Sequence, residues 1–255
     1  MIKNPVAHRN GIPFYHAKTE EEFRLDLYED YGQMVVRQLD LHFGHTPYPW
    51  QKVDNWIASN VVFTKNGEGR ILVEVGCGLG CQIAQLASSH PKCQAYGFDY
   101  SYQMLKIAND YWCRERPLNW LSQRGWGERA KSEVAPAQNL HFGLAKATNL
   151  PLFDQEVDLI FSCFLFDRLQ HPERALIEWH RLLKPGGQLL VISPLNYPHK
   201  GLWENWFPIK KLIEQTRQYG FDLVVSDQLD VQEPMDVNGN QISWAVSCLH
   251  LIKGA

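Results

Sequence analysis

The apolar positions of this 255-residue chain follow two alternating periods, which predict strands and helices in turn. Short apolar runs predict buried strands, and most are followed by segments with apolar residues three or four positions apart. Strands that alternate with helices are typical of a doubly wound α/β fold. We expect seven strands, mostly parallel and with the last antiparallel, at 71–73, 94–98, 140–144, 157–163, 188–193, 223–229 and 245–252.

The residues before the first of these strands show a different pattern. Residues 1–18 are expected to form an irregular arm, because proline and glycine interrupt any regular period. Thr19, followed by three glutamates, predicts the start of a helix that runs through Leu39, and a second helix is expected from about Pro49 to Val62. We therefore expect an N-terminal helical extension at 1–65 on a core domain at 66–255. It could be plain cover for the core or a lid.

The most informative stretch is ILVEVGCGLGCQIAQLA, at 71–87, in which a predicted strand enters a glycine-rich turn and continues as a helix. Gly76, Gly78 and Gly80 stand at every second position. Glycines reach backbone conformations closed to other residues and leave room for a nucleotide at a helix N-terminus. The next predicted strand ends at Asp99, about 20 residues downstream, where a dinucleotide-type fold places the acid that binds ribose. Ordinary tight turns of an α/β core are the alternative.

The glycine spacing also separates possible cofactors. G-x-G-x-G, with Glu74 just before it, differs from the G-x-G-x-x-G of hydride-transfer enzymes and resembles class I S-adenosylmethionine-dependent methyltransferases. The segment LKPGGQLLVI, at 183–192, is similar to that family's helix, turn and fifth strand. The resemblance implies a Rossmann-like fold, methyl transfer of EC class 2.1.1, and S-adenosyl-L-methionine as the cofactor, with S-adenosyl-L-homocysteine as product.

The resemblance also implies a set of cofactor contacts. Asp99 would bind both ribose hydroxyls, Glu74 would support the turn, and Phe98 and Tyr100 would flank the adenine or belong to the core. Lys146 stands where the family often has an aspartate that contacts adenine. The expected cofactor-binding residues are Glu74, Gly76, Cys77, Gly78, Gly80, Phe98, Asp99, Tyr100, Met104, Ala145, Lys146, Ala147 and Cys163.

A closer similarity points to the methyl acceptor. Several stretches resemble the carnosine N-methyltransferase family, which methylates the imidazole ring of a histidine dipeptide. The resemblance implies a nitrogen of an imidazole or a related amine as acceptor. An O-, S- or C-methyltransferase of another small metabolite and a non-catalytic cofactor-binding protein of the same fold are the alternatives. The similar stretches are GCGLG, FDYSYQML, NWLSQ, CFLFD, SPLNYP and YGFDLV, with a fainter match in SWAVSCLHLIK.

Carried over by position, Asp167 would accept a hydrogen bond from one nitrogen of the acceptor ring. This fixes the tautomer and leaves the lone pair of the other nitrogen facing the methyl group. A helix cap or a pair with Arg168 is the structural alternative. The family's substrate-contacting histidine aligns with Pro198, and His199 stands one residue later. The expected catalytic residues are Asp167, Tyr197 and His199, and the other expected acceptor contacts are Asn196, Trp203, Trp244 and Tyr48.

Composition narrows the partners and the compartment. A net charge of −3 gives no reason to expect nucleic acid or an anionic membrane. No apolar run has the length of a membrane span, and the first residues lack a signal-peptide core, so we expect a cytoplasmic protein. The six cysteines and ten histidines show no ligand spacing, so no metal is expected. The expected partner is a small-molecule substrate, and the oligomeric state stays open.

Overall fold

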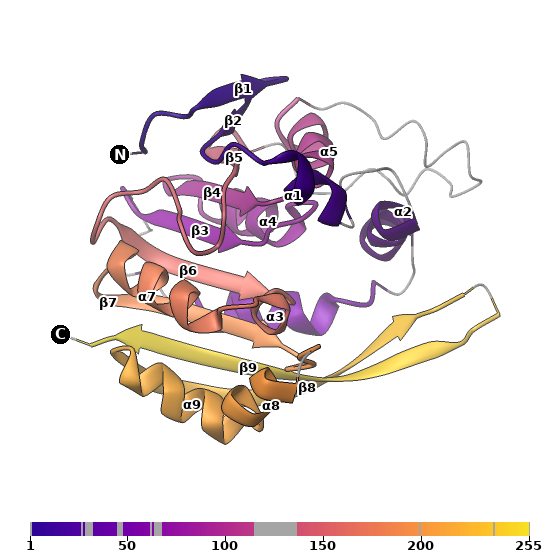
Figure 1. Ribbon diagram of the computed structural model, residues 1–255, viewed down its shortest axis with the longest axis vertical. Coiled ribbons are helices and arrows are strands. Elements are labelled where there is room, and N and C mark those ends of the chain that lie inside the picture. The colour runs from indigo at the N-terminus through magenta and orange to yellow at the C-terminus, as the bar shows by residue number, and fades with distance from the viewer. Residues whose placement is uncertain are drawn as a thin grey trace.

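A nine-stranded mixed sheet between two layers of helices forms the protein in the computed structural model (Figure 1). The expected α/β fold with a mostly parallel sheet is confirmed, whereas the expected number of seven strands is wrong. The structure describes residues 2–26, 28, 33–44, 48–61, 63, 68–114, 137–198, 200–236 and 238–254. The strands are β1 Ala7–Arg9, β2 Ile12–Phe14, β3 Ile71–Val75, β4 Gln94–Asp99, β5 Leu140–Leu144, β6 Val157–Cys163, β7 Leu183–Ser193, β8 Phe221–Pro234 and β9 Gln241–Lys253.

Helices cover both faces of the sheet (Figure 1). The side chains of α3, α4 and α5 bury one face, and those of α7, α8 and α9 bury the other. No helix in the described part of the chain is long and apolar enough to cross a membrane. The helices are α1 Glu20–Leu25, α2 Gln33–Leu39, a π-helix Asp40–Gly44, α3 Gln51–Asn60, α4 Cys81–Ser89, α5 Tyr102–Trp112, a 3-10 helix Phe166–Arg168, α7 Pro172–Leu182, α8 Lys200–Trp206 and α9 Ile209–Gln218.

The strand order places a switch point at the centre of the sheet. The order is β1-β2-β5-β4-β3-β6-β7-β9-β8, and β3 pairs in parallel with both β4 and β6. The chain therefore moves outward on one side of β3 and then on the other. Open α/β sheets bind ligands beyond the carboxyl ends of their strands at such a point. The glycine turn directly follows β3 and stands there.

The N-terminal arm is where the fold departs most from expectation. Residues expected to be irregular form the hairpin β1–β2, and Phe14 pairs in parallel with Leu144 of β5. Asn10 and Gly11 both have a positive φ, of 51° and 76°, which is the backbone of a two-residue hairpin turn. The glycine that we expected to break regular structure therefore forms the turn between two strands.

The first helix begins where the sequence predicts but is shorter than expected. Thr19 is the N-cap, and Glu22 completes a capping box with it. Asp26 has an extended backbone, with φ −82° and ψ 109°, and ends α1 there. The helix expected to reach Leu39 is thus two helices, α1 and α2, with no continuous period between them.

A long antiparallel hairpin of β8 and β9 ends the chain and extends beyond the rest of the sheet (Figure 1). The turn predicted at Asn238-Gly239-Asn240 lies between these two strands, and Gly239 has a φ of 90°. The hairpin contacts the N-terminal helices, because Trp56 of α3 donates to Asp227 at 2.8 Å and Arg37 of α2 pairs with Glu233. Helices α2 and α3 therefore pack against this hairpin.

Candidate functional site

The glycine turn after β3 has a backbone that other residues reach only with strain. Gly76, Gly78 and Gly80 have φ values of 75°, 51° and 73°. A Cβ added at Gly80 would lie 2.5 Å from the ring of Phe142, and one at Gly76 would lie 2.8 Å from the side chain of Leu165. The turn therefore needs glycine for both its conformation and its close packing. We call Gly76, Gly78 and Gly80, whose backbone carries no side chain, the cradle.

Asp99, at the end of β4, is bonded to this turn. Its Oδ2 accepts from the backbone N–H of Gly78 at 2.8 Å, and its Oδ1 accepts from that of Ser101 at 2.8 Å. Burial raises the pKa of Asp99, and these two bonds counteract the increase. A carboxylate has about four acceptor sites, so each oxygen can still accept from a ribose hydroxyl.

Glu74, in β3, supports the start of α4. The N-cap of α4 is Gly80, which has no side chain to cap the helix. The buried carboxyl of Glu74 accepts from the backbone N–H of Ile83 at 3.0 Å and satisfies a first-turn donor instead. Burial raises the pKa of Glu74 well above its usual range. That Glu74 supports a cofactor-binding turn stays a prediction.

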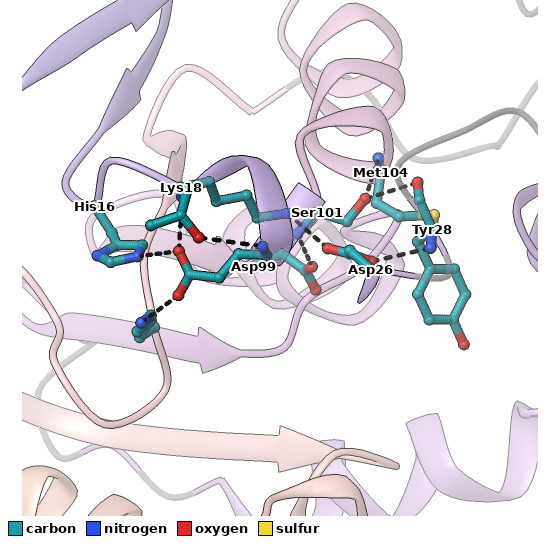
Figure 2. A network of polar contacts seen from close by, with 10 residues as sticks. His16, Lys18, Asp26, Tyr28, Asp99, Ser101 and Met104 are labelled. Carbon is teal, nitrogen blue, oxygen red and sulfur yellow. Dashed lines mark hydrogen bonds and ion pairs between the residues drawn. The ribbon is translucent and has the colours of Figure 1, made fainter. Parts of the chain in front are cut away.

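The N-terminal segment lies across the turn that follows β4 (Figure 2). The hydroxyl of Ser101 donates to the backbone carbonyl of Tyr28 at 2.9 Å. Lys18 donates to Asp26 at 2.7 Å, and its ammonium group stands 4.2 Å from the ring centroid of Tyr100. The sequence did not indicate this docking, because nothing in the local pattern of residues 16–28 specifies a partner.

The lysine at position 146 has an acidic partner from the same N-terminal segment. Lys146, just after β5, donates to Glu22 of α1 at 2.7 Å. The lysine and the backbone of Thr19 hold the pKa of Glu22 well below its usual range. An acid therefore does stand at this end of β5, but it comes from α1.

The other expected cofactor-binding residues lie partly in the core and partly at the turn and the strand ends. Phe98 is 1% exposed and packs in the core, which is the alternative considered for it. Met104 lies against the turn, 3.3 Å from a Cβ built at Gly78. Ala145 donates its backbone N–H to the carbonyl of Asp99 at 3.1 Å, and the carbonyl of Ala147 accepts from Trp179 at 3.1 Å. Cys77 is buried, and Cys163 is half-buried at the end of β6.

On the acceptor side, Asp167 holds a loop together. Its fully buried carboxyl accepts from the hydroxyl of Ser193 at 2.8 Å and from the backbone N–H of Asn196 at 3.1 Å. Arg168 is a more distant neighbour, at 3.9 Å. Asp167 thus ties the loop after β7 to the 3-10 helix after β6. In this geometry it acts through that loop and not by direct contact with an acceptor.

The remaining acceptor candidates do not gather in one place. Tyr197 and Trp203 pack in the cluster under α7, α8 and α9, and Trp203 donates to the carbonyl of Tyr197 at 2.7 Å. Tyr48 and Trp244 pack against the cluster on the opposite face. Burial raises the pKa of Tyr197. His199 lies outside the described residues, as does the NWLSQ stretch.

Trp244 and Tyr48 each belong to a polar group on that second face. Trp244 donates to Glu233 at 2.6 Å within the β8–β9 hairpin. The hydroxyl of Tyr48 lies 3.3 Å from Nδ1 of His42 and accepts from Gln82 at 3.4 Å, and Gln82 also donates to Asp54. Sequence reasoning missed Asp54 and Gln82. Their signal was a polar residue at an apolar position of a helix, beside Val53 and Ile83.

The described residues contain no candidate metal site. No group of three or more histidine, cysteine, aspartate or glutamate side chains in the described ranges is arranged to hold a metal ion.

Comparisons with known proteins agree with the fold and the turn. Residues 73–191 match the family described as a methyltransferase domain. The chain is 25% identical over 174 residues to a malonyl-[acyl-carrier protein] O-methyltransferase of Marinomonas sp. (strain MWYL1), which covers 68% of this chain and 55% of that protein. The chain therefore spans about half the length of this curated relative.

Two solved structures illustrate the likeness of fold. A chain of the complex between the Haloferax volcanii Trm112 methyltransferase activator and a methyltransferase has a TM-score of 0.62 at 17% identity, covering 90% of this chain and 98% of that one. A SAM-dependent methyltransferase from Aquifex aeolicus has a TM-score of 0.53 at 16% identity, covering 88% and 100%. These findings show a fold like that of S-adenosylmethionine-dependent methyltransferases and a match to the methyltransferase domain family over somewhat less than half of the chain.

Proposed function

We propose that this protein binds S-adenosylmethionine over the glycine turn and transfers its methyl group to a small molecule. The observation that carries the proposal is the cradle of Gly76, Gly78 and Gly80, closed on one side by Asp99. When bound, the cofactor supplies a methyl group on a positively charged sulfur. Asp99 would hold the ribose hydroxyls, and the side-chain-free turn would admit the rest of the cofactor.

The protein's own contribution to such a transfer is alignment and exclusion of water. Glu74 fixes the first turn of α4 and with it the glycine turn. Tyr28, Lys18 and Glu22 hold the N-terminal segment over the end of β4. None of these groups needs to react, because a sulfonium methyl is already activated for in-line displacement.

For the acceptor we propose a nitrogen of an imidazole or a related amine. The stretches that resemble carnosine N-methyltransferases support it, since four of them, CFLFD, SPLNYP, FDYSYQML and GCGLG, lie in the described strand ends and the turns and helix that follow them. An oxygen acceptor is the second candidate, because the relative that matches 68% of this chain is named an O-methyltransferase. A fold of this kind accommodates either.

Calorimetry with S-adenosylhomocysteine tests the cofactor site. Asp99→Ala should weaken binding by about 100-fold or more, because it removes two charge-assisted hydrogen bonds of about 1.5–3 kcal/mol each. Asp154→Ala, which changes an exposed carboxylate paired with Arg181, is the control and should bind as the wild type does. An unchanged affinity in Asp99→Ala would contradict the assignment.

Labelled cofactor with a panel of acceptors tests the reaction. Histidine, carnosine, thiol-imidazoles and phenols should separate the candidates, and we expect the label on an imidazole nitrogen. Label only on phenol oxygen would favour the second candidate. Tight cofactor binding without transfer to any member would point to the non-catalytic alternative.

A further inference from the structure

Four polar side chains, two buried and two partly buried, meet on the face of the sheet that α3 and α4 cover. Tyr48 precedes α3, Asp54 lies within it, Gln82 lies in α4, and His42 lies in the π-helix. The Tyr48 hydroxyl lies 3.3 Å from His42 Nδ1 and 3.4 Å from Gln82 Nε2, which also lies 3.3 Å from Asp54 Oδ1. We call this set the Tyr48 network. It joins three helical segments by side chains alone.

The Tyr48 network borders the glycine turn. Gln82 follows Gly80 by two residues, and Cys81 stands between them. Burial raises the pKa of Tyr48, and neighbouring Cys81, Asp54 and Cys163 raise it further. Cys163 is the last residue of β6, the strand next to β3. The network therefore stands beside the carboxyl ends of the two central strands, where the methyl group would be presented.

Folding does not account for the buried carboxyl in this network. Glu74, by comparison, caps α4, whereas Asp54 bonds only to the side chains of Gln82 and Tyr48 in the described part of the chain. It is 9% exposed and stands beside Val53 and Ile57. A carboxyl buried among apolar groups costs free energy, so such a group is a candidate for function.

Aromatic rings with an unused donor stand next to the network. The Trp50 ring lies 4.7 Å from Phe164 and 6.2 Å from His42, measured between centroids. Trp50 is 6% exposed, and its indole N–H has no hydrogen-bond partner among the described residues. Buried N–H groups almost always have a partner, so this donor calls for an acceptor atom that the described residues do not provide.

We propose that Trp50, Tyr48 and the Tyr48 network bind the methyl acceptor, and that this acceptor is a planar nitrogen heterocycle with one N–H. This inference rests on the proposed function and names the residues of its acceptor side. The rings of Trp50, Phe164 and His42 provide flat walls for a planar ligand. The indole N–H donates to a substituent of the heterocycle, and the Tyr48 oxygen accepts from its ring N–H.

The proton balance of the transfer assigns a role to Asp54. The lone pair of one ring nitrogen forms the new N–C bond as the C–S bond breaks, and the electron pair of that bond stays on sulfur. The methylated ring is then a cation, and it becomes neutral by releasing the proton of its other nitrogen. Tyr48 receives this proton and passes its own to the carboxylate of Asp54, so Asp54 is a positioning residue that acts through Tyr48.

The charge states around Asp54 fit this role. Burial raises the pKa of Asp54 to about 6, and the bonds from Gln82 and Tyr48 counteract the rise. Asp54 is therefore ionised at neutral pH. The titratable groups that face it are Tyr48, Glu74 of β3, Cys81 of α4, Cys163 of β6 and, through Tyr48, His42. Burial raises the pKa of Cys81 and Cys163 and lowers that of His42 to about 4, so these three groups are neutral there at pH 7. Burial also raises the pKa of Glu74.

NMR titration of the protein with imidazole at pH 8, after saturation with S-adenosylhomocysteine, tests the inference. Imidazole should bind at least 10-fold more weakly to Tyr48→Phe than to the wild type, since the variant loses one hydrogen bond of about 1.4 kcal/mol. Histidine, which has a substituent that can accept from the indole N–H, should bind at least 10-fold more weakly to Trp50→Phe than to the wild type for the same reason. Asp227→Ala is the matched control, because it removes another side-chain contact of α3, the bond from Trp56. It should bind imidazole as the wild type does.

A pH series separates Asp54 from a merely structural carboxyl. Pyrazole, which stays neutral from pH 5 to pH 9 as an ordinary property of that ring, is the probe. Its affinity for the wild type should fall as the pH drops below about 6 and Asp54 takes up a proton, and the profile of Asp54→Asn should be flat. Identical profiles, or imidazole affinities equal in all variants, overturn the inference.

The proposed function fails in a different way. A wild-type protein that does not bind S-adenosylhomocysteine contradicts the cofactor site itself. A protein that binds it tightly, yet has no measurable affinity for imidazole or pyrazole, contradicts only the acceptor site proposed here. Binding of S-adenosylhomocysteine by each variant also shows that the variant is folded.

Discussion

The cofactor end and the acceptor end of the site, both at the carboxyl edge of one sheet, differ in the hydrogen-bond partners of their buried polar groups. At the cofactor end, backbone N–H groups of Gly78, Ser101 and Ile83 bind the carboxylates of Asp99 and Glu74. At the acceptor end, Trp50 Nε1 is buried with no hydrogen-bond partner among the described residues. The carboxylates of the cofactor end are paired within the polypeptide, whereas the acceptor end holds a buried donor without an acceptor.

The polypeptide therefore supplies the hydrogen-bond partners at the cofactor end, whereas a ligand is needed to supply them at the acceptor end. Backbone bonds hold the cofactor end in one geometry, so the cradle is organised before anything binds. Unpartnered buried donors cost free energy, and a ligand that pairs with them recovers it. Substitutions at the two ends are expected to change stability by different amounts, and the largest change is expected at the cradle.

The largest effect is expected from crowding the cradle. Gly80→Ala and Gly186→Ala share a φ of 73°, but a Cβ at Gly80 would meet Phe142 whereas nothing lies within 4 Å of one at Gly186. Backbone strain alone costs about 1–2 kcal/mol, and overpacking adds about 1–3 kcal/mol. Urea unfolding should therefore show about 2–5 kcal/mol lost in Gly80→Ala and only about 1–2 kcal/mol in Gly186→Ala. Equal losses would mean that the cradle is not closely packed.

A smaller and pH-dependent effect is expected from Asp54→Asn. The folded-state pKa of about 6 exceeds the ordinary value of 3.8, so the folded protein binds more protons than the unfolded chain between these values. Stability falls by about 2 kcal/mol as the pH rises from about 4 to about 6 and does not recover above it. Asparagine does not ionise, so the variant should gain about 2 kcal/mol over the wild type between pH 4.5 and pH 8.

Urea unfolding at those two pH values measures the change, and Asp154→Asn, at an exposed position, is the control. The same stability difference at both pH values would show that Asp54 does not titrate as its burial requires. A gain in stability with a loss of heterocycle binding would sharpen the contrast between the two ends.

The smallest effect is expected from Glu22→Gln at the cofactor end. Glutamine keeps the capping box with Thr19 but loses the ion pair with Lys146. The pKa of Glu22 is lowered on folding, so the pair stabilises the protein above the ordinary pKa, and this contribution is lost as the pH falls. The pair is partly exposed and is worth at most about 1 kcal/mol, less at high salt.

Thermal unfolding at low and high salt measures this contribution. Glu204→Gln, in the exposed pair with Lys200, is the control and should change stability less than Glu22→Gln. A salt-independent loss well above 1 kcal/mol would mean that Glu22 does more than pair with Lys146.

The sequence predicted the centre of the molecule better than its borders. The bounds of β5 and β6 agree with the expected runs, because a run of five to seven mostly apolar residues marks a buried strand locally. β1 and β2 have three residues each, too few for any period, and β2 pairs with β5 across more than a hundred residues of sequence. A partner so distant leaves no local signal, so the arm was misjudged.

The same distinction applies to the site. The glycine turn and Asp99 stand in adjacent elements whose order in the chain places them together. Asp54 and His42 come together with Gln82 only through the packing of three helical segments. Asp167 was predicted at the correct edge, but its bonds to Ser193 and Asn196 depend on how two loops meet.

Two bulky residues after β6 and β7 have a backbone conformation that lowers the stability of the protein. Phe164 after β6 and Leu195 after β7 have φ values of 56° and 54°, a left-handed backbone that costs a side chain about 1–2 kcal/mol each. A chain optimised for stability alone would place glycine or asparagine there. Directed evolution for thermostability alone should therefore replace these residues early and erode ligand binding as it does so, which marks both positions as ones to hold fixed in engineering.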